Sequence, residues 1–202
     1  MGKIVIFGGA FNPPHNMHFS LAEQIINEYE DIEKVIFMPV NSKYQKREAL
    51  ASNEHRYNML KLVCDSNEKF EVSSLEINSE RPLYTIETLT LLQQQYPDKE
   101  LLFTTGTDNL KEFETWNSPQ KILDNFKILV LERDKDNMEE IINSNEFLNK
   151  NKNAFIKLKN HTRSDLSSTL VRQKIRNGQS ISELIPDKVY KYIKENKLYE
   201  EI

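Results

Sequence analysis

The sequence has one cysteine, no long hydrophobic run and no excess of basic residues. Cys64 has no second cysteine to pair with inside the chain, which excludes an internal disulfide and favours a reducing compartment. The first apolar stretch, residues 4–9, is too short for the core of a signal peptide. No window approaches the roughly 18 apolar residues of a membrane span. We therefore expect a cytoplasmic protein without a membrane partner.

The charge balance lacks what a protein built to neutralise a nucleic-acid backbone needs. The chain has 27 Lys and Arg against 31 Asp and Glu, a net charge of −4. Aromatic residues are not interleaved with basic ones, as they are in single-strand binders. The 38% apolar and 29% charged residues are typical of a globular protein, and 202 residues can bury a core. We expect one domain over residues 1–202 with no nucleic-acid partner, and either a monomer or a homodimer.

Short apolar runs alternate with amphipathic stretches, and neither an internal repeat nor a linker interrupts them. The apolar runs predict strands at 3–9, 34–39, 69–77, 100–106, 126–133 and 154–158. The amphipathic stretches predict helices at 19–29, 52–65, 84–97, 167–178 and 186–196. Residues 40–51 are expected to be a polar loop, and 143–153 a surface loop or fraying helix. The alternation predicts an α/β fold with a Rossmann-like, doubly wound parallel sheet.

Ligands of such folds bind at the carboxyl ends of the strands. One such end carries Gly8 and Gly9, between a strand and a helix. Glycine lets backbone N–H groups approach an anion closely, and the dipole of the following helix favours negative charge. The run GGAFNP matches neither GxGxxG nor GxxxxGK[ST], so it indicates neither a dinucleotide fold nor a P-loop. By itself the pair could equally be a turn.

His15 and His18 follow this turn at a spacing that places both on one side of a helix start. A zinc site would need a third or fourth ligand, and neither His55 nor His161 stands at a supporting spacing. A histidine could also serve only as a helix cap. The third interpretation is that two imidazoles donate hydrogen bonds to a phosphoryl group.

A second anion-directed element stands far along the chain in the run LSSTLVR. Ser167, Ser168 and Thr169 supply hydroxyls and free N–H groups at a helix start, and Arg172 adds a planar charged fork one turn later. Alone, this pattern is also that of a capped helix with a solvated arginine. Two phosphate-directed helix starts in one chain favour a nucleoside triphosphate as ligand.

Four runs carry a family resemblance over nearly the whole chain: GGAFNPPHNMH, RPLYTIETL, GTDNLKEFETW and LSSTLVR. In this order they resemble the nucleotidyltransferase superfamily with its HxGH and ISSTxxR signatures. YTIETL and the tryptophan eight residues after Asp108 make the chain most similar to the bacterial nicotinate mononucleotide adenylyltransferases. The resemblance implies the HIGH-type nucleotidyltransferase fold. It also implies transfer of the adenylyl group of ATP to nicotinate mononucleotide in NAD biosynthesis, with Mg²⁺ carried by the ATP phosphates and no metal ligand among the side chains.

The resemblance also implies a role for each matching residue. The catalytic residues would be His15, His18, Lys46 and Arg172. The ATP site would contain those two histidines and Arg172, together with Gly8, Gly9, Ala10, Phe11, Gly106, Asp108, Ser168 and Thr169. The acceptor site would contain Lys46, Thr85, Trp116 and Arg133.

The chain departs from the family pattern at two places. Met17 stands where the family's HxGH motif has glycine, and Lys43-Tyr44-Gln45 replaces the PPH before the loop lysine. That loop lies beside the acceptor in the family, so other acceptors stay open: nicotinamide mononucleotide, phosphopantetheine or another phosphate ester, with adenylyl or cytidylyl transfer. A nucleotide-binding relative without turnover is the alternative from another class.

Overall fold

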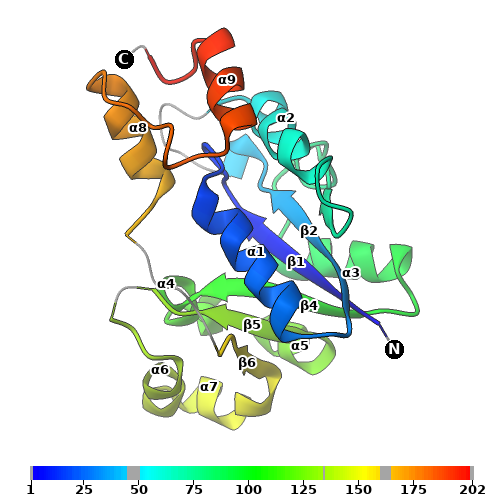
Figure 1. Cartoon of the computed structure of the whole chain (residues 1–202). Helices are drawn as coiled ribbons and strands as arrows, with labels where there is room; N and C mark the ends of the chain where they lie inside the picture. The colour runs from blue at the N-terminus through cyan, green and yellow to red at the C-terminus, as the bar shows by residue number, and fades with distance from the viewer. Residues whose placement is uncertain (1, 45–50, 134, 160–164, 201–202) are drawn as a thin grey trace.

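The structure is a computed structural model that describes residues 2–44, 51–133, 135–159 and 165–200. Within this part of the chain, parallel strands form one six-stranded sheet in the order β3-β2-β1-β4-β5-β6 (Figure 1). The strands are β1 (Lys3–Gly9), β2 (Ile32–Pro39), β3 (Phe70–Val72), β4 (Glu100–Gly106), β5 (Lys127–Leu131) and β6 (Phe155–Lys157). This is the doubly wound order, which reverses direction between β1 and β4.

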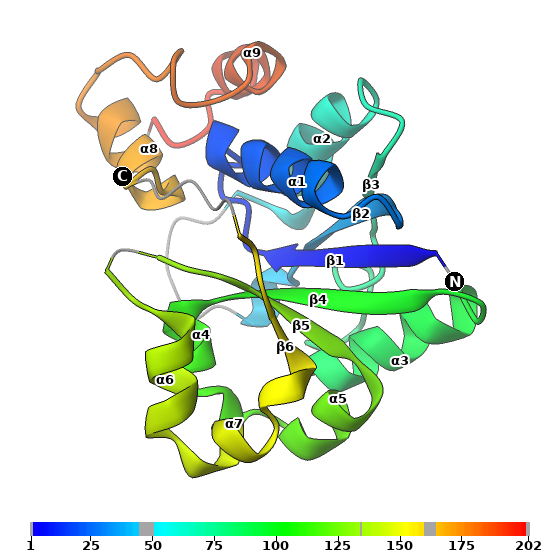
Figure 2. The same ribbon diagram turned by 60° about the horizontal axis from the view of Figure 1, so that its bottom comes forward.

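Helices cover both faces of the sheet, as the alternating pattern predicts. In Figure 2, α1, α2, α8 and α9 lie on one side of the strands and α3 to α7 on the other. The helices are α1 (Asn16–Glu28), α2 (Asn53–Cys64), α3 (Thr85–Gln95), α4 (Thr107–Leu110), α5 (Pro119–Asn125), α6 (Met138–Ser144), α7 (Glu146–Lys150), α8 (Ser168–Arg176) and α9 (Asp187–Glu195). None of the described helices is long and apolar enough to cross a bilayer.

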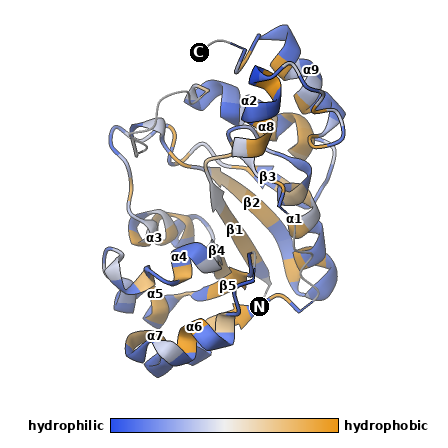
Figure 3. Cartoon of the chain, turned by 90° about the vertical axis from the view of Figure 1, so that its left-hand side faces the viewer, coloured by the Kyte–Doolittle hydropathy of each residue, from blue (hydrophilic) through white to orange (hydrophobic). Residues whose placement is uncertain are grey.

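The core is built on the two faces of the sheet, whose strands are hydrophobic in Figure 3. Because side chains alternate along a strand, Ile4 and Ile6 of β1 pack into one cluster, with α3 and α5. Val5 and Phe7 pack into the other, with α1 and α2. A third cluster joins α2 to α8 and α9. It fixes the two C-terminal helices beside the carboxyl end of β1, where Asn16 N–H also donates to Leu184 O.

One sequence prediction needs correction, and one open alternative is decided. The strand predicted at 69–77 ends at Val72, because the chain then folds into turns. Of the two alternatives for residues 143–153, a surface loop or a fraying helix, the structure shows a helix: α6 ends at Ser144 and α7 covers Glu146–Lys150. Asn137 caps α6 by accepting from two backbone N–H groups, and Asn145 caps α7 by accepting from Leu148 N–H. An asparagine therefore starts each of these helices.

Candidate active site

A cavity of about 550 Å³ opens at the carboxyl ends of β1 and β4, where the strand order reverses. Its size is that of a small-molecule site. The sequence-predicted residues that line it come from five segments: Gly8, Gly9, Ala10, Thr85, Gly106, Trp116 and Arg133. Thr105 also lines the cavity, and its buried Oγ1 has no hydrogen-bond partner among the described residues. An unsatisfied buried hydroxyl of this kind is typical of a wall that meets a ligand.

Two glycines of the cavity have close side-chain neighbours. A Cβ at Gly9 would lie 3.0 Å from the ring of Phe11, and one at Gly106 would collide with the Asp108 carboxylate. Phe11 itself is 1% exposed and has a φ of 47°, a backbone conformation that is rare for a bulky residue. Its ring therefore lies beneath the glycine turn, edge-on to His18 at 4.9 Å, and supports the turn instead of facing the cavity.

The two histidines form a stack at the start of α1. Their ring centroids are 3.7 Å apart with an interplanar angle of 23°. His15 precedes the helix in an extended conformation, and its N–H donates to His18 Nδ1 at 3.1 Å. A neutral His18 must then carry its proton on Nε2. His18 is thus both a helix cap and a side chain with one directed N–H donor.

Burial holds both imidazoles in the neutral form at pH 7. Burial and, to a smaller extent, the positive charge of Arg133 together lower the pKa of His15 to about 4. The pKa of His18 is well below its usual value because of burial, with His15 and Arg133 adding to the effect. His15 Nδ1 is buried and has no hydrogen-bond partner within the described residues. An anion at this place would offset the desolvation of both rings.

The run LSSTLVR, the second predicted phosphate-binding element, is hydrogen-bonded to the turn between β1 and α1, which carries the first. Ser168 Oγ donates to Pro13 O at 2.8 Å, and Arg172 Nη1 donates to Asn12 O at 2.7 Å. Ser167 caps α8 by accepting from Leu170 N–H. Two motifs more than 150 residues apart therefore meet, but Ser168 and Arg172 each direct one donor at a backbone carbonyl. These bonds fix the turn that carries the histidines.

Arg133 connects the cavity to the histidines. Its guanidinium pairs with Asp108 at 3.3 Å, with both side chains more than half exposed, and its backbone N–H donates to Thr107 Oγ1. Such an exposed pair adds little stability. It does hold a positive charge at the rim of the cavity, close enough to lower the pKa of both histidines. Lys46, the other predicted phosphate ligand, lies outside the described residues.

Comparison with known proteins agrees with this geometry. Residues 6–174 match the model of the cytidylyltransferase-like family. The probable nicotinate-nucleotide adenylyltransferase of Clostridium acetobutylicum is 36% identical, over 98% of this chain and all of its own. The nicotinate-nucleotide adenylyltransferase of Bacillus subtilis is 32% identical, over 99% of this chain and all of its own. The chain belongs to the nicotinate-nucleotide adenylyltransferase family.

The fold agrees with a solved structure as well. The nicotinic acid mononucleotide adenylyltransferase of Plasmodium falciparum, complexed with NaAD, superposes with a TM-score of 0.78 at 19% identity. The match covers 99% of this chain and 98% of the other, so the architecture of this family member is shared along its whole length.

Met17, the departure inside the histidine motif, does not fill the site of this family member. It is the second residue of α1, is half-buried and packs against the core cluster that contains Phe7 and Phe19. In the altered loop, Lys43 Nζ donates to Glu80 O at 3.1 Å, and its backbone N–H donates to Asn41 Oδ1. Gln45 lies outside the described residues.

Sequence reasoning missed Arg56, which joins the walls of the site from behind. It is 1% exposed and donates to Ala10 O at 2.8 Å and to Val40 O at 2.7 Å. It also bonds Ala51 O and Asn53 Oδ1. One buried guanidinium therefore fixes the glycine turn, the end of β2 and the start of α2. A charged residue one turn before the inward-facing Met59 and Leu60 of a predicted helix was the available signal.

Asn41 and Glu76 were also missed, and both line the far wall of the cavity. Asn41 Nδ2 donates to Glu76 O and, at 2.9 Å, to Ser79 O. The Glu76 carboxyl accepts from Thr88 Oγ1 at 2.7 Å. Burial raises the pKa of Glu76, and the Thr88 bond only partly opposes this. The wall is therefore polar, and burial disfavours ionisation of its one buried carboxyl.

An ion pair holds the start of α3 at the cavity. Arg81 Nη1 lies 2.9 Å from Glu87 Oε2, which also accepts from Tyr84 N–H, and these contacts lower the pKa of Glu87 to about 2. Thr85, the first residue of α3, is thereby fixed beside the cavity. Trp116 stacks on Phe113 at 4.6 Å, and its ring lines the same cavity.

Proposed function

We propose that this chain transfers the adenylyl group of ATP to nicotinate mononucleotide, forming nicotinate adenine dinucleotide and pyrophosphate in NAD biosynthesis. The observation that carries the proposal is a single cavity with two different ends. One end has the glycine turn, and the other has Thr85 and Trp116. The histidine stack lies outside the lining, behind the glycine turn, where the ring of Phe11 contacts His18. The names of the relatives support the same reaction.

The ATP end would bind the phosphates at the glycine turn. Gly8 and Gly9 let backbone N–H groups approach the triphosphate, and His18 Nε2–H adds a donor. Gly106 and Asp108 would lie against the ribose, and Ser168, Thr169 and Arg172 would complete the phosphate site. Among the described residues, no group of three or more His, Cys, Asp or Glu could hold a metal. ATP would bind as its Mg²⁺ complex, with the metal on phosphate oxygens.

The chemistry needs no general base. A phosphate monoester has a second pKa of about 6, so the acceptor phosphate is largely ionised at pH 7. One of its oxygens attacks the α-phosphorus of ATP and forms the new P–O bond. The bond from the α-phosphorus to the oxygen bridging the β-phosphorus breaks, and pyrophosphate leaves with the electron pair. The protein aligns two anions and stabilises spreading charge, for which neutral imidazole donors and Arg133 are suited.

The acceptor end would distinguish nicotinate from nicotinamide. The first N–H groups of an α-helix have no partner within the helix, and the helix dipole favours an anion there. Thr85 begins the 11-residue α3 and adds a hydroxyl. A carboxylate on the pyridine ring gains from both, whereas a neutral carboxamide gains little. Trp116 would stack on the ring, and Lys46 and Arg133 would bind the acceptor phosphate.

We further infer a cytoplasmic, single-domain enzyme over residues 1–202 without nucleic-acid or membrane partners. The acidic charge balance supports the absence of a nucleic-acid partner. Gel filtration with light scattering would distinguish a monomer from a homodimer.

The test is pyrophosphate release by the purified protein with Mg²⁺, using ATP or CTP against a panel of acceptors. We expect turnover with ATP and nicotinate mononucleotide. Faster turnover with nicotinamide mononucleotide or phosphopantetheine would replace the acceptor, and faster turnover with CTP would replace the nucleotide. ATP binding without release for any acceptor would make the chain a nucleotide-binding relative.

A further inference from the structure

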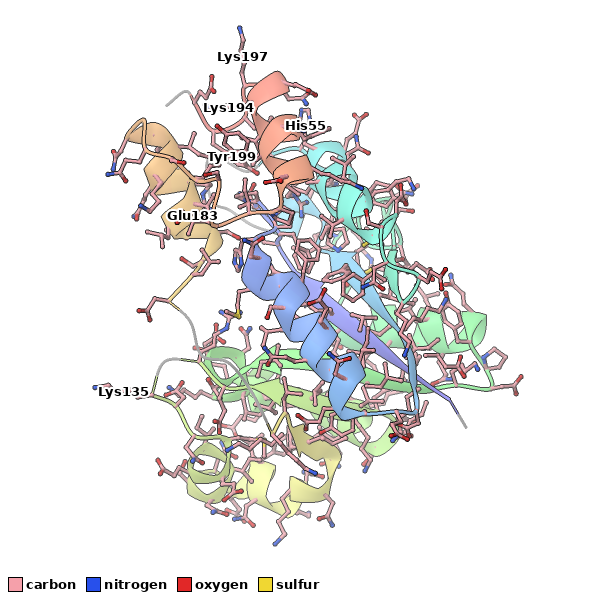
Figure 4. The ribbon with its side chains drawn as sticks, in the orientation of Figure 1. His55, Lys135, Glu183, Lys194, Lys197 and Tyr199 are labelled. Carbon is pink, nitrogen blue, oxygen red and sulfur yellow. The ribbon has the colours of Figure 1, made fainter. Side chains whose placement is uncertain are left out.

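The segment after α9 returns to the site. Lys197 and Tyr199 have φ values of 49° and 67°, so two non-glycine residues in the left-handed region reverse the chain. Such conformations persist only where the surroundings fix them. Leu198 packs against the third core cluster, and its N–H donates to Ile193 O. Figure 4 shows Tyr199 in the space between α8 and α9.

Tyr199 ends this return with a hydrogen bond to the turn between β1 and α1. Its hydroxyl donates to Asn12 Oδ1 at 2.8 Å, across 187 positions of the sequence. The same Oδ1 accepts from Ala51 N–H at 3.0 Å, and Asn12 is 1% exposed. Asn12 O accepts from Arg172. Three distant segments therefore meet on one buried asparagine.

Asn12 lies three residues before His15 in the same turn. Between them, Pro13 O accepts from Ser168, so this turn is held at two successive carbonyls by α8. None of these bonds fixes the side chain of Asn12. Ala51 N–H and the Tyr199 hydroxyl both donate to its side-chain Oδ1. A change at Tyr199 reaches the histidine stack through only a few bonds.

The Tyr199 hydroxyl stays protonated at neutral pH and can therefore donate this hydrogen bond. Burial raises the pKa of Tyr199, and this outweighs the opposing effect of the nearby Arg172 and Arg56. The phenol therefore keeps its proton over the whole neutral range. Tyr199 therefore lies near both Arg172, which bonds the carbonyl of Asn12, and Arg56, which bonds the carbonyl of Ala10.

We propose that Tyr199 is a positioning residue for ATP: by holding Asn12, it fixes the turn that presents His15 and His18 to the phosphates. The inference rests on the proposed function, because it assigns the turn to ATP. Tyr199 acts through Asn12 and does not touch the substrate.

The experiment compares Tyr199→Phe with a matched control, Tyr192→Phe. Both tyrosines are half-buried in the same C-terminal lobe, and both lose only a hydroxyl. The Tyr192 hydroxyl contacts His55 Nδ1 at 3.0 Å and Asn58 Nδ2 at 3.2 Å, between α9 and α2. Figure 4 shows His55 beside these helices. The control thus removes a hydroxyl of the same lobe whose partners lie on α2, and not on the turn between β1 and α1.

The readouts are steady-state kinetics, thermal unfolding and hydrogen exchange of the peptide spanning residues 8–19. We expect Tyr199→Phe to lower kcat/KM for ATP about 3- to 10-fold, as for the loss of one hydrogen bond, with KM for the acceptor little changed. Exchange in the 8–19 peptide should rise. Tyr192→Phe should match the wild type in both, although its melting temperature falls by a similar amount.

Equal kinetics and equal exchange in the two variants would overturn the role of Tyr199. So would a loss in Tyr199→Phe that affects ATP and acceptor alike. If the wild-type protein itself fails to turn over ATP with nicotinate mononucleotide, the proposed function fails. The exchange comparison then still decides whether Tyr199 fixes the turn.

Discussion

Replacing His18 by alanine removes two separate contributions of one side chain. The ring supplies the acceptor Nδ1 for His15 N–H at 3.1 Å, and it supplies an Nε2–H donor for the phosphates. The first contribution concerns the start of α1 and therefore stability. The second concerns the transition state and therefore turnover.

The two magnitudes are different enough to separate. Loss of a capping interaction costs about 1 kcal/mol of unfolding free energy. Loss of one directed donor to a developing charge lowers kcat about 10²- to 10³-fold, or about 3–4 kcal/mol. We expect His18→Ala to show both losses, with a milder effect on ATP affinity, because the donor acts mainly in the transition state.

His18→Gln isolates the second contribution. Glutamine at the third position of a helix is a natural partner for the N–H of the capping residue, so it can replace the acceptor Nδ1. We expect this variant to regain most of the stability in urea unfolding, while kcat in the pyrophosphate-release assay stays at least about 10²-fold below the wild type. If His18→Gln recovers both stability and kcat, His18 is a helix cap and the phosphate role is wrong.

Two further predictions follow from the other groups of the site. Trp116→Ala should raise KM for the acceptor about 10- to 100-fold, as for the loss of one stacked ring, and leave KM for ATP nearly unchanged. Trp116→Phe should recover most of the acceptor affinity, and equal rises in both KM values would remove Trp116 from the acceptor site. Because the pKa of His15 is about 4 in the folded protein and about 6.5 unfolded, only the unfolded chain takes up this proton as the pH falls. Between pH 6.5 and 4, His15 alone therefore lowers the free energy of unfolding by about 3 kcal/mol. His15→Gln should flatten the profile of unfolding free energy in urea over this interval, whereas parallel profiles for the two proteins contradict the buried neutral histidine.

The fold could be predicted because its signals are local. The four central strands each contain a continuous apolar run, and four of the five predicted helices have a clear start or stop, such as Ser52 before α2. Composition could not decide between a loop and a helix at residues 143–153, because asparagine favours both loops and helix caps. Only the capping bonds of Asn137 and Asn145 show which of the two applies.

The candidate site also has one part that the sequence predicts and one part that it does not. Its motifs could be found because the chemistry of phosphate binding needs glycine, imidazole and arginine near helix starts. The contacts between the motifs could not be found, because they join segments that are far apart in the sequence. Arg172 reads as a phosphate ligand in the sequence, yet the fold directs one of its donors at Asn12 O. Arg56 and Tyr199 also act through partners that are distant in the sequence, so their contacts could not be predicted from it.

In the proposed reaction, one cavity joins ATP to a mononucleotide whose ring carries a carboxylate. A competition reaction tests it most directly: ATP, Mg²⁺ and equal concentrations of nicotinate and nicotinamide mononucleotide, with both dinucleotide products measured by mass spectrometry. The product ratio gives the ratio of the two kcat/KM values. We expect the nicotinate dinucleotide to exceed the other at least about tenfold, since a charged group gains about 1.5 kcal/mol or more over a neutral one from directed donors. Equal amounts of both dinucleotides, or an excess of the nicotinamide form, would contradict the claim.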